Sequence, residues 1–190
     1  VGPMERRLAR LAMAMVIVFA GSLFLPLQNI TLENSGVNLD TNKNSSCVIC
    51  INELMPNADG SDQGIFPQGE WVELFNTGSS SVSLEGWTIV DIGGWTHPIN
   101  ENTWVGFSDL PTPYLIEPGA YVVIAENEIG TLRLNNGGET VYLKDSQNSV
   151  VHEITTGQAG NGVSKISSGS NGEWVDSEQP TPGAENSAGE

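Results

Sequence analysis

Hydrophobic and polar residues alternate in short runs from Cys47 onward, and turn residues separate the runs. A period of two is typical of β-strands, because successive side chains point to opposite faces of a sheet. Asn, Gly and Pro between the runs favour tight turns. The pattern predicts nine strands, over residues 48–55, 70–76, 83–91, 114–116, 120–126, 131–134, 140–144, 150–155 and 163–167. Short strands with no helix between them predict an all-β fold, an antiparallel β-sandwich.

One predicted strand carries apolar groups on both of its faces. Its alternation places Val72 and Leu74 on one face, and Trp71, Glu73 and Phe75 on the other. A strand with apolar groups on both faces is expected in the centre of a sheet that is covered on both sides.

The N-terminal part has the layout of an export signal. Three arginines, Arg6, Arg7 and Arg10, precede an uncharged apolar run over residues 11–27. This order predicts a cytoplasmic N-terminus and an exported remainder. A helix of this length spans about 25 Å against a hydrocarbon core of about 30 Å, so cleavage and retention in the membrane both stay open. We expect a secreted or cell-surface protein with four parts: a signal peptide or membrane anchor (1–27), a polar linker (28–46), a sandwich domain (47–186) and a tail (187–190).

The charge of the chain is strongly negative. Lys and Arg number 7 against 23 Asp and Glu, which gives a formal net charge of −16. Binding to nucleic acid requires cations that displace counterions from phosphates, so we expect no DNA or RNA partner. The same charge attracts divalent cations or basic partners.

Several short motifs follow one another in a specific order. They are Ile51-Asn52-Glu53-Leu54, Glu70-Trp71-Val72-Glu73-Leu74-Phe75-Asn76-Thr77-Gly78, Val82-Ser83-Leu84-Glu85-Gly86-Trp87-Thr88-Ile89, Ile116-Glu117-Pro118-Gly119-Ala120-Tyr121-Val122-Val123-Ile124, Leu134-Asn135-Asn136-Gly137-Gly138-Glu139-Thr140-Val141, and Pro180-Thr181-Pro182-Gly183-Ala184-Glu185-Asn186 after Trp174. In this order they resemble the lamin tail domain family, over about Val48 to Asn186. The resemblance implies an immunoglobulin-like antiparallel β-sandwich, of a kind found in nuclear lamins and in exported microbial proteins. It also implies a protein-interaction or scaffold role.

Two of these motifs have a physical interpretation of their own. Asn76-Thr77-Gly78 follows a predicted strand, and Asn and Gly tolerate the positive φ of tight turns, so these residues are expected to build a corner. Trp87 lies beside Gly86 in an apolar run, which indicates a core tryptophan with a small neighbour.

Residues 91–113 depart from the simpler pattern of that family as a long loop. Trp95, Trp104 and Phe107, with Tyr114 just after it, make this insertion rich in aromatic side chains. Such side chains stack on sugar rings or dock a protein, which makes these four residues a candidate partner surface. The alternative is that they fold back on the sandwich as a lid.

The loop over residues 57–69 resembles a calcium-binding loop. From Asp59 it gives D-x-S-x-Q-G-x5-E, with Gly64 in the sixth place and Glu70 in the twelfth. Asp59, Asp62 and Glu70 are therefore candidate calcium ligands, and calcium is the one metal or cofactor that the sequence indicates. The alternative is an acidic, solvated hairpin loop.

The two cysteines form C-x2-C without a second pair that would complete a zinc site. On a regular strand, Cys47 and Cys50 point to opposite faces about 10 Å apart, beyond the reach of a disulfide. We therefore expect one buried and one exposed thiol; pairing would require a local turn or a second chain.

Catalytic groups are sparse. The sequence has no G-x-S-x-G elbow and two histidines, His97 and His152. His152 begins an H-E-x-x-H pattern, but Thr156 replaces the second ligand. We expect both histidines on the surface or in loops. Glu53 and Glu73 lie in predicted strands, where structural hydrogen bonding is expected, and we expect no enzymatic activity.

The sequence thus predicts a non-catalytic interaction or scaffold module, tethered through residues 11–27 if the signal is not cleaved. Its partner would be a protein or a cell-surface polysaccharide. Two alternatives stay open: a carbohydrate-binding module that uses the aromatic residues of the insertion, and an accessory domain of a larger secreted hydrolase.

Overall fold

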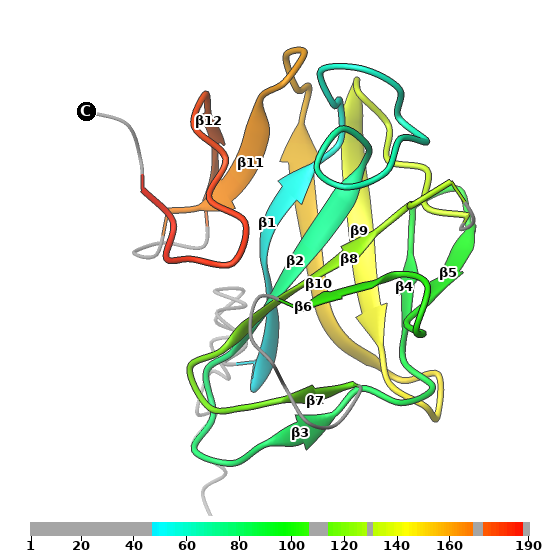
Figure 1. The fold of residues 1–190 in the computed structure, drawn as a ribbon, viewed down its shortest axis with the longest axis vertical. Coiled ribbons are helices and arrows are strands. Elements are labelled where there is room, and N and C mark those ends of the chain that lie inside the picture. Colours follow the sequence, from blue (N-terminus) through cyan, green and yellow to red (C-terminus); the bar gives the residue numbers. More distant parts are fainter. Residues whose placement is uncertain (1–46, 107–113, 129–130, 169–172, 188–190) are drawn as a thin grey trace, which may run out of the picture. The chain divides into compact units, whose positions relative to one another are not determined.

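The computed structural model describes residues 47–106, 114–128, 131–168 and 173–187 (Figure 1). The predicted signal peptide or anchor and the polar linker lie outside these residues. In the part of the chain that the structure describes, no helix combines the length and the apolar character needed to cross a membrane.

The described residues form antiparallel sheets (Figure 1). The larger sheet has the strand order β12 (Trp174–Ser177), β11 (Ser164–Ser167), β1 (Ile49–Met55), β2 (Trp71–Asn76), β8 (Tyr121–Ala125) and β6 (Trp104–Gly106). The smaller sheet has the order β10 (Val150–Gly157), β9 (Gly138–Lys144), β4 (Thr88–Val90) and β5 (Thr96–Pro98). A short pair joins β3 (Val82–Ser83) to β7 (Leu115–Ile116). The prediction of an all-β antiparallel fold is confirmed, and the arrangement is consistent with an immunoglobulin-like sandwich.

The predicted strand over residues 83–91 is interrupted by a turn. Gly86 adopts φ +76°, a left-handed conformation that favours glycine, and the N–H of Trp87 donates to the carbonyl of Leu84 at 3.0 Å. The run therefore divides into β3 and β4. Three further strands were not predicted from the sequence: β5, β6 and β12.

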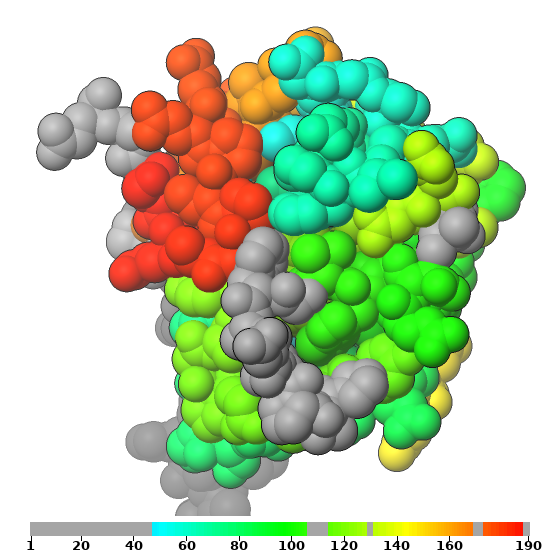
Figure 2. Space-filling model, viewed as in Figure 1, coloured from blue at the N-terminus to red at the C-terminus, as the bar shows by residue number. Residues whose placement is uncertain are grey.

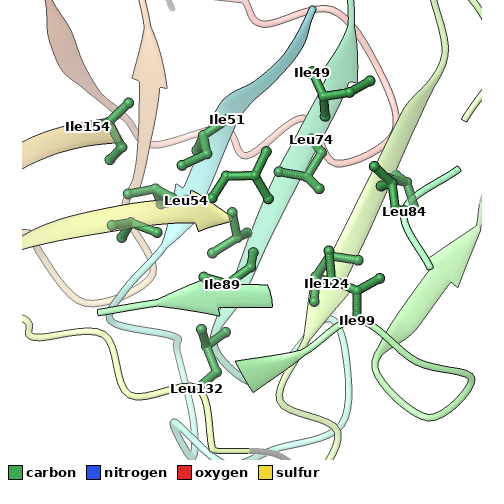
Figure 3. Packing of buried hydrophobic residues seen from close by; sticks show 14 of the residues in the cluster. Ile49, Ile51, Leu54, Leu74, Leu84, Ile89, Ile99, Ile124, Leu132 and Ile154 are labelled. Carbon is green, nitrogen blue, oxygen red and sulfur yellow. The ribbon is translucent and has the colours of Figure 1, made fainter. Parts of the chain in front are cut away.

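The main core cluster joins side chains from both sheets (Figure 3). Its labelled members are Ile49, Ile51, Leu54, Leu74, Leu84, Ile89, Ile99, Ile124, Leu132 and Ile154. Full burial of an isoleucine or leucine stabilises a fold by about 1.5–3 kcal/mol relative to exposure, so this cluster is the principal apolar contribution to stability.

β2 lies between β1 and β8 and is covered on both faces, as its alternation predicts. Val72 and Leu74 belong to the main cluster, whereas Trp71 belongs to a second cluster with Met55 and Val123. The expectation of a central strand is confirmed.

The predicted corner after β2 is also confirmed. Asn76 is fully buried, and its Nδ2 donates to the carbonyls of Ser80 at 3.0 Å and Ile116 at 2.9 Å. Its Oδ1 accepts the N–H of Gly78 at 2.9 Å. One side chain therefore satisfies three backbone groups at this corner. Trp87, the predicted core tryptophan, is half-buried and packs against the main cluster.

The expectation of one buried and one exposed thiol is wrong, because Cys47 and Cys50 form a disulfide with their Cα atoms 5.3 Å apart. Strand β1 begins at Ile49, so Cys47 lies before it, next to a bend at Val48, and not on the regular strand. The bend brings the two sulfurs together, which is the local turn that pairing requires.

Candidate functional site

Three buried carboxylates hold the chain segment over residues 131–135. Each accepts one backbone N–H of the segment. Glu126 accepts that of Leu132 at 2.8 Å, Glu70 that of Leu134 at 3.1 Å, and Glu139 that of Asn135 at 2.8 Å. The predicted strand at 131–134 is wrong, because side chains bind the N–H groups that a neighbouring strand would otherwise bind. The segment nevertheless sends Leu132 into the main cluster (Figure 3).

Burial raises the pKa of Glu70 to about 8. The bond from Leu134 opposes this shift, while the charges of Asp62, Glu126 and Glu139 add to it. Glu70 is therefore largely protonated at neutral pH, and it accepts the N–H of Leu134 without carrying a full buried charge.

His97 is fully buried, so its expected place on the surface or in a loop is wrong. Its Nε2 lies 3.1 Å from the carbonyl of Ala125, and its Nδ1 accepts the N–H of Thr131 at 3.0 Å. Burial lowers the pKa of His97 to about 4, so the ring is neutral at physiological pH. It connects β5 to β8 and to the 131–135 segment.

His152 is half-buried on β10, and its Nδ1 accepts the N–H of Ile51 on β1 at 2.9 Å. The expectation for this histidine is also wrong, because the ring joins the two sheets. Burial lowers the pKa of His152, which keeps Nδ1 free to accept.

A second group of polar residues lies on the opposite face of the larger sheet from the main core. The register of β1 against β2 shifts between Ile51 and Glu53, so Asn52 is the extra residue of a β-bulge. Glu53 and Glu73 face each other across the same two strands. We call Asn52, Glu53 and Glu73 the strap groove, because they bind residues 178–187, which we call the strap.

The strap is held by hydrogen bonds to all three groove residues. Glu53 accepts the N–H and the hydroxyl of Thr181, each at 3.1 Å, and Glu73 accepts the N–H of Gly183 at 2.5 Å. The Nδ2 of Asn186 donates to the carbonyl of Asn52 at 3.0 Å. Structural hydrogen bonding by Glu53 and Glu73, as expected from their place in strands, is confirmed.

The pKa values of both groove carboxyl groups are raised by their surroundings. Burial raises the pKa of Glu73 to about 7; the bonds from Asn52 and Gly183 oppose this shift, and the charge of Glu53 adds to it. Burial likewise raises the pKa of Glu53. The groove is therefore partly protonated near neutral pH.

The candidate calcium ligands differ in their surroundings. Asp59 is exposed and accepts a hydrogen bond from Asn161 at 2.9 Å, whereas Glu70 is buried against Leu134. The N–H of Glu70 donates to the carbonyl of Asp62 at 2.8 Å. Among the described residues, no group of three His, Cys, Asp or Glu side chains is arranged to hold a metal ion. Calcium binding stays a prediction, which a calorimetric titration with Ca²⁺ would test.

The candidate aromatic residues divide between core and surface. Trp104 and Tyr114 are half-buried, pack against the main cluster and meet edge to face with their ring centroids 6.0 Å apart. Trp95 is 54% exposed. Phe107 lies outside the described residues. For Trp104 and Tyr114 the structure agrees with the lid interpretation, while Trp95 alone of the three described candidates is exposed.

Trp95 lies at the end of a tightly bonded turn between β4 and β5, over residues 91–95, which we call the β4–β5 tip. Its N–H donates to Oδ1 of Asp91 at 2.9 Å, and the N–H of Ile92 donates to Glu139 at 3.0 Å. The guanidinium of Arg133 lies 5.2 Å from the centroid of the Trp95 ring. Ile92, also in the tip, is 62% exposed. The tip thus presents two apolar side chains on a bonded backbone, and the cation of Arg133 lies beside it.

Several residues of these sites are not candidates in the sequence, among them Asn52, Asn186 and Arg133. Asn52 and Asn186 occur within recognised motifs, but nothing in the local pattern pairs them. Arg133 lies in a segment for which the sequence predicts a strand. Its position between the buried Leu132 and Leu134 was a signal that its side chain points outward.

The two antiparallel sheets and the core cluster that joins them are consistent with an immunoglobulin-like β-sandwich. The chain belongs to the lamin tail domain family, whose model matches residues 42–158. β11, β12 and the strap follow the matched region, yet Ser164 and Thr181 complete the hydrogen bonds of Glu53.

Among solved structures, the chain is similar to the archaellum periplasmic stator protein FlaG from Sulfolobus acidocaldarius, with 14% identity and a TM-score of 0.35 over 57% of this chain and 97% of that one. It is also similar to a chain of the FlaF and FlaG stator complex from the same organism, with 13% identity and a TM-score of 0.37 over 64% and 99% of the two chains. Likeness at this level does not bear on function. No curated protein matches the chain.

Proposed function

We propose that this protein is a non-catalytic interaction module, secreted or held at the cell surface through residues 11–27, and that it binds a protein partner through the β4–β5 tip. The observation that carries the proposal is the exposed Trp95, which stacks with Arg133 beside the exposed Ile92. Trp and Arg are the side chains most enriched among energetically dominant interface residues.

Three further features support this proposal. The backbone of the tip is bonded to Asp91 and Glu139, so little conformational entropy is lost there when a partner binds. The buried Glu53, Glu70, Glu73 and His97 all hydrogen-bond within the fold, and this favours a structural role for them over a catalytic one. The disulfide is consistent with an oxidising compartment outside the cytoplasm.

The test is capture of partners from a cell envelope with the full chain as bait, followed by affinity measurement with the purified partner. Trp95→Ala is expected to weaken binding by about 30-fold, as removal of a dominant interface residue does. Val150→Ala is the matched control, because Val150 is similarly exposed, at 52%, and lies at the other end of the β9–β10 hairpin from Glu139. Equal binding by both variants would disprove the tip as the contact site.

A carbohydrate-binding module is the second candidate, because the exposed ring of Trp95 is also able to stack on a sugar. Binding to a glycan array that is lost in Trp95→Ala, without any captured protein, would favour this candidate over a protein partner.

A further inference from the structure

The strap groove recognises a peptide by a defined chemistry. Two carboxylates accept backbone N–H groups two residues apart, from Thr181 and Gly183. The carboxamide of Asn186 pairs with Asn52, donating to its carbonyl at 3.0 Å and to its Oδ1 at 3.2 Å. These contacts constitute a built peptide-binding site that the chain's own C-terminal segment occupies.

The strap itself lies at the surface (Figure 2, red). None of its residues is buried, and none belongs to either core cluster. Its departure would leave the packing of the two clusters unchanged, and would expose the groove carboxylates. Segments with few buried apolar contacts open at a lower free energy than the global unfolding of a domain.

We propose that the strap groove is an exchange site, which binds either the strap of its own chain or the strap of a second copy. The second copy is the occupant that the structure supports, because the groove is complementary to a segment that every copy carries. The same hydrogen bonds form in either case. Reciprocal exchange between two copies would satisfy both grooves and close a symmetric dimer. This proposal is independent of the β4–β5 tip.

Concentration decides between the two arrangements. The strap follows β12 directly, and so short a connection gives an attached segment an effective concentration on the order of millimolar. Because the strap is seated in its own groove, its dissociation constant must lie below that value. The dilute protein is therefore expected to be monomeric, and exchange is expected where copies crowd to about millimolar concentration.

The test uses two full-length variants that lack principal contacts between their own strap and groove. In the strap variant, Gly183→Pro removes the N–H donor and conflicts with φ +85° at this position, and Asn186→Ala removes the carboxamide. In the groove variant, Glu53→Met and Glu73→Met remove the carboxylates that accept the N–H groups of Thr181 and Gly183. Each variant alone is expected to be monomeric by light scattering. An equal mixture at about 1 mM each is expected to contain a species with the summed mass, because the intact groove of one binds the intact strap of the other.

A mixture that contains only folded monomers would overturn the proposal. If either variant fails to fold, two differently tagged copies of the unaltered chain provide the second measurement, after they are concentrated together to about 1 mM and cross-linked at that concentration. Copurification of the two tags is expected for the unaltered chain and for Glu185→Gln, a matched strap substitution at an exposed side chain. Absence of copurification for the unaltered chain would equally overturn exchange.

Discussion

At the scale of single residues, stability in this domain depends on polar side chains that serve several backbone groups at once. Asn76 bonds Ser80, Ile116 and Gly78 from a fully buried position. A buried carbonyl or N–H without a partner costs about 1–3 kcal/mol. Loss of one such side chain is therefore expected to lower the free energy of unfolding by more than a surface substitution usually does.

Asn76→Ala is expected to lower the free energy of unfolding by about 2–4 kcal/mol, because it leaves several backbone groups of the corner unpaired. Urea denaturation of the full chain measures this change. Asn136→Ala is the control, since Asn136 is exposed and is expected to change stability by less than about 0.5 kcal/mol. Equal effects of the two substitutions would contradict the role assigned to Asn76.

At the scale of elements, the 131–135 segment shows how an extended chain is fixed without a strand partner. Glu126, Glu70 and Glu139 accept three of its N–H groups, and His97 accepts that of Thr131. The segment borders β5, where the hydroxyl of Thr131 also donates to the carbonyl of Thr96 at 2.5 Å. Side chains from β5 and β9, and from the residues next to β2 and β8, thus replace the backbone hydrogen bonds that a neighbouring strand would make.

Glu70→Ala is expected to destabilise the domain by about 1–3 kcal/mol and to accelerate hydrogen exchange at the amide of Leu134, because that N–H loses its buried acceptor. Glu70→Gln keeps an acceptor and resembles the protonated form that burial favours, so stability and protection at Leu134 are expected to be retained. Hydrogen exchange resolved at single residues distinguishes the two. Loss of protection in Glu70→Gln would show that the carboxyl group itself is required.

At the scale of the whole molecule, buried titratable groups make stability depend on pH. Glu70 and Glu73, with pKa values raised to about 8 and about 7, bind protons more tightly in the folded state than in the unfolded one. Their contribution to stability is greatest at low pH and is lost as pH rises through about 5 to 8. His97, with a pKa lowered to about 4, acts in the opposite direction and costs stability as pH falls below about 6.5.

The melting temperature is therefore expected to rise as pH is lowered from about 9 to about 6.5, and to rise less steeply below that, where His97 opposes the carboxylates. Calorimetry between about pH 5 and 9 measures this profile. Glu73→Gln is expected to flatten the part between about pH 5 and 7. A melting temperature that increases steadily with pH across this range would contradict the assignment of protonated carboxyl groups in the fold.

Local pattern alone determined the strands with clear alternation, the two covered faces of β2, the corner at Asn76 and the kinship with the lamin tail domain family. These features depend on residues that are close in sequence, or on the order of motifs along the chain. Both can be read from the amino-acid sequence alone. Tertiary structure decided the disulfide, the burial of His97, the 131–135 segment and the strap groove. In the groove, Thr181 reaches Glu53 across 128 residues of sequence, and no periodicity connects positions so far apart. Where a backbone N–H finds its acceptor in a distant side chain, only the folded chain reveals the pair.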